Sequence, residues 1–223
     1  MSGLELDDVS FDLGGRLALS PLTLQLEAGM ITSLSGPSGS GKTTLLSIAG
    51  GLVRPTTGAA SYAGTPMWLG DGDPRREVAF VLQVYGLVPV LSARENISVA
   101  LRARGMSPRD ADDRADLELH RFHIGDLGDR QVEELSGGQM QRVACARGFA
   151  VEPDILLADE PTSELDEGNR EHVMDQLRIE ADRGAVVVVA THDPAVVEAS
   201  DRHVVLDEGV LVGDETRYRA ARY

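Results

Sequence analysis

A glycine-rich loop between an apolar segment and an apparent helix is the feature that most constrains how this chain folds. Residues 30–34 read as a strand, residues 44–49 read as a helix, and the loop between them is Gly36-Pro37-Ser38-Gly39-Ser40-Gly41-Lys42-Thr43. Glycines at this spacing let successive backbone N–H groups point at phosphate oxygens. The order of strand, loop and helix is the context that a phosphate-binding loop requires. We therefore expect an α/β fold in which this loop binds a nucleotide.

The polar residues of the loop have separate expected roles. Lys42 adds a positive charge near the phosphates, and the hydroxyl of Thr43 can ligate Mg²⁺. A glycine turn with a structural role alone would not need this Lys-Thr pair. The predicted nucleotide-binding residues of this segment are Gly36, Ser38, Gly39, Ser40, Gly41, Lys42, Thr43 and Thr44.

Two carboxylates follow a second apolar segment, Ile155-Leu156-Leu157-Ala158-Asp159-Glu160. Alone, this pattern could be a strand that meets a solvated turn. Beside a phosphate loop the roles separate: Asp159 would hold the water shell of Mg²⁺, and Glu160 would polarise the attacking water. Glu160 is the residue that we expect to carry hydrolysis.

The segment Leu135-Ser136-Gly137-Gly138-Gln139 looks like a second phosphate cradle without a nucleotide of its own. Its serine and glycines stand at the apparent start of a helix, and a simple helix N-cap is the alternative interpretation. A chain that carries both motifs suggests a site that another copy completes.

The ordered set of motifs resembles the nucleotide-binding subunit of ATP-binding cassette (ABC) transporters, and the resemblance covers essentially the whole chain. The set comprises the phosphate loop, Gln83, the segment at 135–139, the pair Asp159-Glu160, Ser163-Glu164-Leu165-Asp166, and His192. The resemblance implies a P-loop NTPase core with a mixed β-sheet, an antiparallel β subdomain and an inserted helical lobe. It implies a single domain over residues 1–223, with the core at about 1–83 and 150–223 and the lobe at about 84–149.

The resemblance also implies site residues. Gln83 is similar to the glutamine that senses Mg²⁺ or water at the junction of core and lobe and contacts the membrane partner. His192 resembles the switch histidine that touches the γ-phosphate, and it joins Glu160 and Gln83 as an expected catalytic residue. The expected metal ligands are Thr43, Gln83 and Asp159. Residues expected to act across a dimer are Ser136, Gly137, Gly138 and Gln139 on the nucleotide of the opposite subunit, and Ser163 and Asp166 at the interface.

The chain departs from the family pattern at two positions. The family commonly has an aromatic residue near position 13 that stacks on adenine, whereas this chain has Leu13, with Phe11 on the same strand face. Leu13 is therefore expected to contact the base through apolar contact only. Glu164 stands where a small residue is usual.

The implied function is that of an ATP-hydrolysing subunit, which dimerises head to tail around two Mg²⁺-ATP and drives a transmembrane permease. Its second cassette is either an identical chain or a different ABC subunit. The segments at residues 83–89 and 157–162 resemble those of the subfamily that serves lipoprotein release, macrolide-type export and cell division. The alternative is a soluble ABC-type ATPase that acts on a cytosolic partner, such as a metal-cluster assembly scaffold.

Composition limits the partners and the location. The net charge of −15 over 223 residues argues against a nucleic-acid surface. A DNA-repair ATPase of this superfamily would also need a long insertion before the segment at 135–139, and a translation factor would need two cassettes. The first residues lack the pattern of a signal peptide. The apolar run at 185–190 is too short for a membrane span and predicts a buried parallel strand. We expect a peripheral location on the cytoplasmic face of the plasma (inner) membrane, through a permease.

Local signals predict the remaining elements. Ser92 with Glu95, and Ser107 with Pro108, predict two helix starts. A helix is expected around 169–183 and a hairpin at 203–213. The single Cys145 excludes an internal disulfide, fits a reducing compartment and is expected to be buried. Three patterns are given no functional role: His120 with His123 as a metal pair, Asp71-Gly72-Asp73 as a calcium loop, and the basic tail at 217–223, which is expected to be a solvated end.

Overall fold

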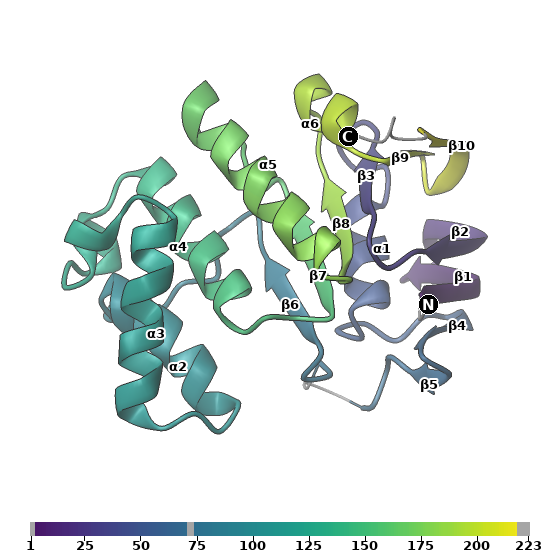
Figure 1. Ribbon diagram of the computed structural model, residues 1–223. Helices are drawn as coiled ribbons and strands as arrows, with labels where there is room; N and C mark the ends of the chain where they lie inside the picture. Colours follow the sequence, from purple (N-terminus) through teal and green to yellow (C-terminus); the bar gives the residue numbers. More distant parts are fainter. Residues whose placement is uncertain (1–2, 71–73, 218–223) are drawn as a thin grey trace.

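The computed structural model describes residues 3–70 and 74–217, and two β-sheets organise this part of the chain (Figure 1). The segment at 71–73, where the calcium-loop pattern was considered, lies outside the described residues, as does the tail from 218 onward. The larger sheet has the order β10-β9-β3-β8-β7-β6, and the smaller has the order β2-β1-β4-β5.

The larger sheet is mixed, as predicted. Its neighbours β9-β3, β3-β8, β8-β7 and β7-β6 are parallel, and β10 runs antiparallel to β9 as the second strand of the expected hairpin. The valine run forms β8 and pairs with strands on both sides. The strands are β3 (Ile31–Ser35), β6 (Val78–Val81), β7 (Ile155–Asp159), β8 (Val186–Ala190), β9 (Arg202–Asp207) and β10 (Val210–Thr216).

The smaller sheet is entirely antiparallel, which confirms the expected β subdomain. In its first strand Leu4 and Leu6 are buried while Glu5 between them is exposed, so one face covers the core and the other meets water. The strands are β1 (Leu4–Leu13), β2 (Arg16–Leu26), β4 (Thr57–Tyr62) and β5 (Thr65–Pro66).

The central strands bury side chains on both faces, and the alternation divides the core into two clusters. Leu156 and Ala158 of β7 face the cluster that includes residues of α2, α3, α4 and α5. Ile155 and Leu157 of the same strand face the cluster that includes residues of α1 and the antiparallel sheet. The helix that follows the phosphate loop and the helix that follows residues 135–136 therefore lie on opposite faces of the sheet.

The helices begin where the local signals predict. Ser92 and Glu95 form a capping box at the start of α2, and Ser107 caps α3 with Pro108 in its first turn. Figure 1 shows α2, α3 and α4 gathered at one side of the larger sheet. The domain boundaries at 83/84 and 149/150 stay a prediction. The helices are α1 (Lys42–Ala49), α2 (Ala93–Ala103), α3 (Pro108–Arg121), α4 (Gly137–Ala150), α5 (Glu167–Asp182) and α6 (Pro194–Ala199), with 3₁₀ turns at Gly125–Leu127 and Val132–Glu134.

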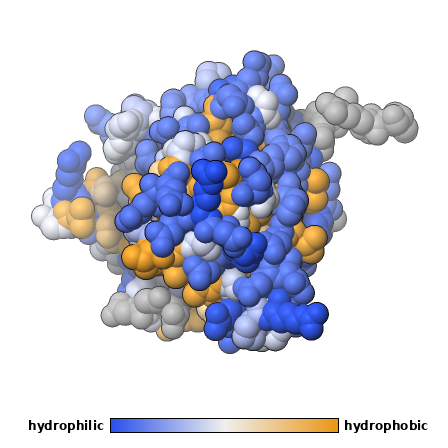
Figure 2. All heavy atoms as spheres, turned by 90° about the vertical axis from the view of Figure 1, so that its left-hand side faces the viewer, coloured by the Kyte–Doolittle hydropathy of each residue, from blue (hydrophilic) through white to orange (hydrophobic). Residues whose placement is uncertain are grey.

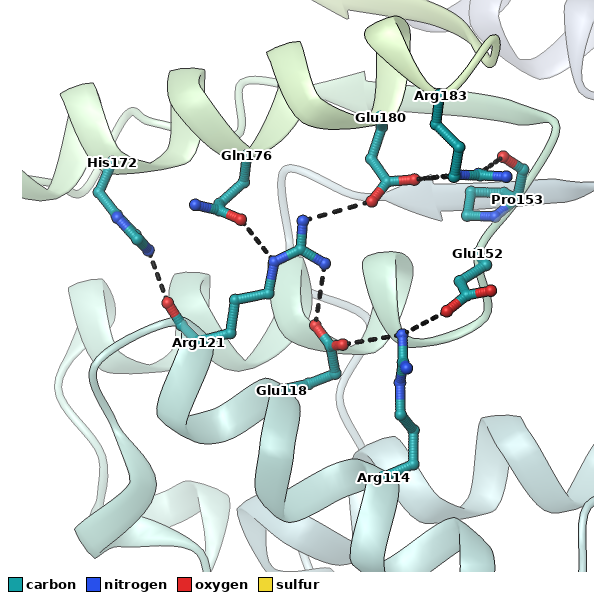
Figure 3. A network of polar contacts seen from close by, with 9 residues as sticks. All are labelled: Arg114, Glu118, Arg121, Glu152, Pro153, His172, Gln176, Glu180 and Arg183. Atoms are coloured by element: carbon teal, nitrogen blue, oxygen red, sulfur yellow. Dashed lines mark hydrogen bonds and ion pairs between the residues drawn. The ribbon is translucent and has the colours of Figure 1, made fainter.

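A polar network joins α3 to α5 (Figure 3). The guanidinium of Arg121 donates to Gln176 and pairs with Glu180 on α5 at 3.3 Å and with Glu118 on its own helix at 3.4 Å. Arg121 also lies 5.5 Å from the ring centre of Phe149 on α4. Both glutamates are 3% exposed. Burial raises the pKa of Glu118, and the neighbouring arginines oppose this rise.

The cysteine and the two histidines that were given no functional role have structural surroundings. Cys145 is fully buried, as expected, and burial raises its pKa to about 12. His120 is exposed with its ring nitrogen bonded to the carbonyl of Asp116, and the ring of His123 stacks against His172 at 4.2 Å. Within residues 3–70 and 74–217, no helix is both long and apolar enough to cross a membrane.

Candidate functional site

The carboxyl ends of the parallel strands bring the predicted motifs to one edge of the larger sheet. The phosphate loop follows β3, Asp159 is the last residue of β7, and His192 comes two residues after β8. Because β3, β8 and β7 are neighbours and parallel, these ends meet at the same edge. Ligands of open α/β sheets bind at this kind of edge.

The phosphate loop has a conformation that requires glycine at positions 36 and 41. Gly36 has φ of +145° and Gly41 has φ of +102°, and a Cβ at Gly36 would lie 2.0 Å from the carbonyl oxygen of Leu206. A larger residue at Gly36 would therefore collide with β9. Lys42 lies over the loop, where its Nζ donates to the carbonyls of Gly36 at 2.8 Å and Pro37 at 3.0 Å. Hydrogen bonds from Lys42 to its own loop thus hold the ammonium group against the backbone of the loop.

Thr43 and Asp159, two of the three expected metal ligands, are in direct contact. The hydroxyl of Thr43 donates to Oδ2 of Asp159 at 2.6 Å, although the residues are 116 positions apart. Burial raises the pKa of Asp159, and the bond from Thr43 opposes this rise. A hydroxyl and a carboxylate are hard oxygen donors of the kind that Mg²⁺ prefers, so the pair fits this ion.

Glu160 and His192 form a second contact pair beside the first. Nδ1 of His192 lies 2.8 Å from Oε1 of Glu160, and the hydroxyl of Thr191 donates to Oε2 at 3.4 Å. The backbone of Glu160 has φ of +51°, a strained conformation of the kind that accumulates at functional sites. The Glu160 side chain is 10% exposed and the His192 side chain 75%. The Glu160 carboxylate is therefore mostly buried and held by hydrogen bonds, and the His192 imidazole is exposed to solvent.

The contact between these two residues predicts a measurable change at His192. The hydrogen bond to Glu160 raises the pKa of His192 above 6.5. The stabilisation by the attraction between Glu160 and His192 is fully present below about pH 6.5, and it is lost as the pH rises through the raised pKa of His192 in the folded protein. In Glu160→Gln the charge is gone, so the pKa of His192 should fall toward its ordinary value. Titration of the imidazole protons by NMR measures this, and an unchanged pKa would contradict the pairing.

A cleft of about 650 Å³ opens beside the phosphate loop. Leu13 is 69% exposed and lines this cleft, and its contact with the base stays a prediction, whereas Phe11 is half-buried and packs against the core cluster next to α1. The two side chains therefore have different surroundings. The motifs did not predict the lining residues from β2, from the end of β9 and from the turn after it, because no local motif marks these residues. They are Arg16, Leu17, Ala18, Asp207 and Glu208.

The segment at 135–139 starts α4. Ser136 is the N-cap, its hydroxyl accepts from the backbone of Gln139, and the Gln139 side chain accepts from the backbone N–H of Ser136 at 2.9 Å. The expected N-cap is thus present, extended to a capping box. Figure 1 shows α4 apart from α1, with the larger sheet between them. Within one chain, this segment does not share a site with the phosphate loop.

The other predicted residues surround the acidic pair or lie farther from it. Ser163 donates to the carbonyl of Glu160 at 3.2 Å. Asp166 caps α5, and the bonds from Asn169 lower its pKa. Gln83 is exposed two residues after β6, and its side chain has no hydrogen bond to any other described residue. Gln83 is the one expected metal ligand that the structure does not join to Thr43 and Asp159.

The fold and the edge of the sheet define a P-loop nucleotide-binding protein with an acidic pair at the end of a parallel strand. The family model described as ABC transporter matches residues 19–163. The chain belongs to the ABC transporter family and contains its ATP-binding domain.

Relatives and solved structures agree with this assignment. The lipoprotein-releasing system ATP-binding protein LolD of Paramagnetospirillum magneticum is 39% identical over 94% of this chain and 97% of its own length. An uncharacterized ABC transporter ATP-binding protein of Mycobacterium tuberculosis is 44% identical, and the chain spans 61% of that relative's length. The ATP-binding cassette MJ0796, solved as a dimer bound to ADP and Pi, superposes with a TM-score of 0.91 at 33% identity, covering 97% of this chain and 100% of that one.

Proposed function

We propose that this chain is an ATPase that drives a membrane transporter, with Glu160 as the catalytic base. The observation that supports this most directly is the contact of His192 and Thr191 with the Glu160 carboxylate. These contacts hold the Glu160 carboxylate at the edge of the sheet where the phosphate loop begins, which supports its proposed role as base. A solved relative, MJ0796, holds ADP and Pi, the products of the reaction proposed here.

The proposed reaction is in-line attack of water on the γ-phosphorus. The water proton passes toward Glu160, the bond from the γ-phosphorus to the bridging oxygen breaks, and ADP and phosphate leave. The residues at 36–44 hold the phosphates, and His192 orients the base and faces the γ-phosphate. Thr43 and Asp159 would hold Mg²⁺, whose charge offsets that of the phosphates, and Gln83 is proposed as a third ligand.

We propose that two chains share each nucleotide, because the start of α4 lies on the opposite face of the sheet from α1. Ser136, Gly137, Gly138 and Gln139 of one chain would close on the ATP held by the other. Ser163 and Asp166, in the loop after Glu160, would lie at the interface. The dimeric MJ0796 cassette is consistent with this arrangement. The second cassette is either an identical chain or a different ABC subunit.

Replacement of Ser136 by Arg tests the shared site. The bulky cation should block closure, so ATP-driven dimerisation and hydrolysis should fall by about a hundredfold or more. ATP binding by the monomer should stay within about twofold, because the phosphate loop is untouched. Sedimentation with and without ATP, titration with a fluorescent ATP analogue, and phosphate release measure the three quantities.

Ser107→Arg is the matched control, because Ser107 caps α3 as Ser136 caps α4. The control loses a helix cap but should still dimerise. Hydrolysis at the full rate by monomeric Ser136→Arg would refute the shared site.

A transmembrane permease is the proposed partner, which would place the chain on the cytoplasmic face of the plasma (inner) membrane. The segment after Gln83 exposes Val84 at 80%, Val88 at 43% and Val90 at 72%. The face that includes α2–α4 is mainly hydrophilic with separate apolar patches (Figure 2). Apolar groups at such a surface suit a protein partner. The similarity to LolD favours the subfamily that serves lipoprotein release.

The alternative is a soluble partner, as for a cassette of a metal-cluster assembly scaffold. Capture of membrane extracts on the tagged chain distinguishes the two. Recovery of a permease that is lost on Val84→Asp supports transport, and recovery of soluble proteins alone would contradict it.

A further inference from the structure

A carboxylate lies at the start of α4, where no anion was expected from this chain. Oε2 of Glu164 is 3.2 Å from the point at which a Cβ on Gly137 would stand, and the Tyr85 hydroxyl is 3.5 Å from the same point. Glu164 comes from the loop between β7 and α5, and Tyr85 follows β6. Three segments distant in sequence therefore meet at Gly137.

Two further observations agree with this placement. A Cβ on Gly138 would lie 2.8 Å from the backbone oxygen of Glu164, so the loop packs closely on the first turn of α4. Burial raises the pKa of Tyr85, and the negative charge of Glu164 raises it further. The close packing of its backbone on α4 therefore positions Glu164, and its negative charge affects the pKa of Tyr85.

No hydrogen bond within the described residues holds the side chain itself. Glu164 is exposed, and its carboxylate accepts no hydrogen bond from any residue in the described ranges. The first turn of a helix carries unpaired N–H groups and the positive end of the helix dipole, which attract a negative charge. The carboxylate thus lies near the start of α4 without a hydrogen bond to any described residue.

We propose that Glu164 is an internal anion that competes with the γ-phosphate of the partner's ATP for the start of α4. This inference rests on the proposed shared site. Closure brings a triphosphate to Gly137 and Gly138, and like charges a few ångströms apart repel strongly where water is excluded. The carboxylate has to swing toward solvent first. Glu164 therefore raises the ATP concentration needed for closure and leaves ATP binding by the open monomer unchanged.

The test uses the full chain with Glu160→Gln, so that hydrolysis does not consume the dimer. Dimerisation is followed by sedimentation as Mg²⁺-ATP is titrated. Adding Glu164→Gln should lower the ATP concentration at half-maximal dimerisation by about tenfold. Glu164→Asp, which keeps the charge on a shorter side chain, should give a value between the parent and Glu164→Gln.

Glu215→Gln is the matched control, because Glu215 is exposed on β10 and its loss changes the net charge of −15 by the same amount. It should leave the titration unchanged, which separates a local effect from general repulsion between two acidic chains. Binding of a fluorescent ATP analogue by the monomer should be equal in all variants.

The outcomes are distinguishable. If Glu164→Gln dimerises at the same ATP concentration as Glu215→Gln, or at a higher one, the role of Glu164 is wrong while the shared site stands. If the Glu160→Gln parent forms no ATP-dependent dimer, the shared site is wrong, and the inference about Glu164 is wrong with it.

Discussion

Glu160→Gln should bind Mg²⁺-ATP and dimerise, yet hydrolyse ATP about 10²–10⁴-fold more slowly than the parent chain. Glutamine keeps the shape of the side chain and its contact distance to His192, so the site should remain assembled. It lacks the basic oxygen that takes the water proton. The loss should therefore appear in kcat, with little change in the affinity for ATP.

Steady-state phosphate release and equilibrium binding of ATP measure these two quantities. Glu198→Gln is the matched control, since Glu198 is exposed on α6, the helix that follows His192, and has no ion pair among the described residues. Its rate should match that of the parent. Hydrolysis by Glu160→Gln at the parent's rate would remove Glu160 from the role of base.

Arg121→Met should lower the free energy of unfolding by about 3 kcal/mol, which is the lower end of what removal of one partner from a buried ion pair produces. Methionine fills the space against Phe149 but leaves Glu118 and Glu180 with less positive charge, and both are 3% exposed. Arg114 and Arg183 still pair with these glutamates at 3.0 and 2.9 Å, which limits the loss. Urea unfolding of the parent chain and of Arg121→Met measures this difference in the free energy of unfolding.

The pH dependence of this destabilisation identifies its cause. Loss of the Arg121 charge should raise the pKa of Glu118 further above its already raised value. A group with a raised pKa in the folded state favours folding at low pH, and this contribution is lost as the pH rises through that pKa. The deficit of Arg121→Met should therefore be larger at about pH 8 than at about pH 5.

Two variants separate the network from general effects of substitution. Arg109→Met replaces an exposed arginine of the same helix and should change stability by less than about 0.5 kcal/mol. Adding Glu180→Gln to Arg121→Met removes one of the buried charges and should restore part of the loss. An Arg121→Met chain as stable as the Arg109→Met control would show that the network does not stabilise the contact between α3 and α5.

Local elements were predictable because their signals are local. The phosphate loop, the caps at Ser92, Ser107 and Ser136, and the buried valine strand each depend on residues a few positions apart. A serine at an N-cap or a run of valines has the same conformational preference in any fold. The family resemblance then supplied the architecture, which the similarity to solved cassettes confirms.

Contacts between distant segments were less predictable. The role of Glu164 was left open at the sequence level, and the structure brings it to Gly137 beside Tyr85. The residues from β2, from the end of β9 and from the turn after it that line the cleft carry no motif. Phe11 and Leu13 were expected on one face of β1, but the register of β1 with β2 shifts between Phe11 and Asp12, and the two side chains have different surroundings.

The sequence by itself determined the chemical groups of this protein and their order: a phosphate loop, two acidic residues after an apolar strand, and a histidine after the valine run. Only the tertiary structure decided which of these groups meet. The parallel order β3-β8-β7 joins Thr43 to Asp159 and Glu160 to His192, and burial of the sheet on both faces separates α4 from α1. The physical reason is that hydrogen bonding between strands and burial of their side chains act between segments far apart in the chain, where local preference carries no information.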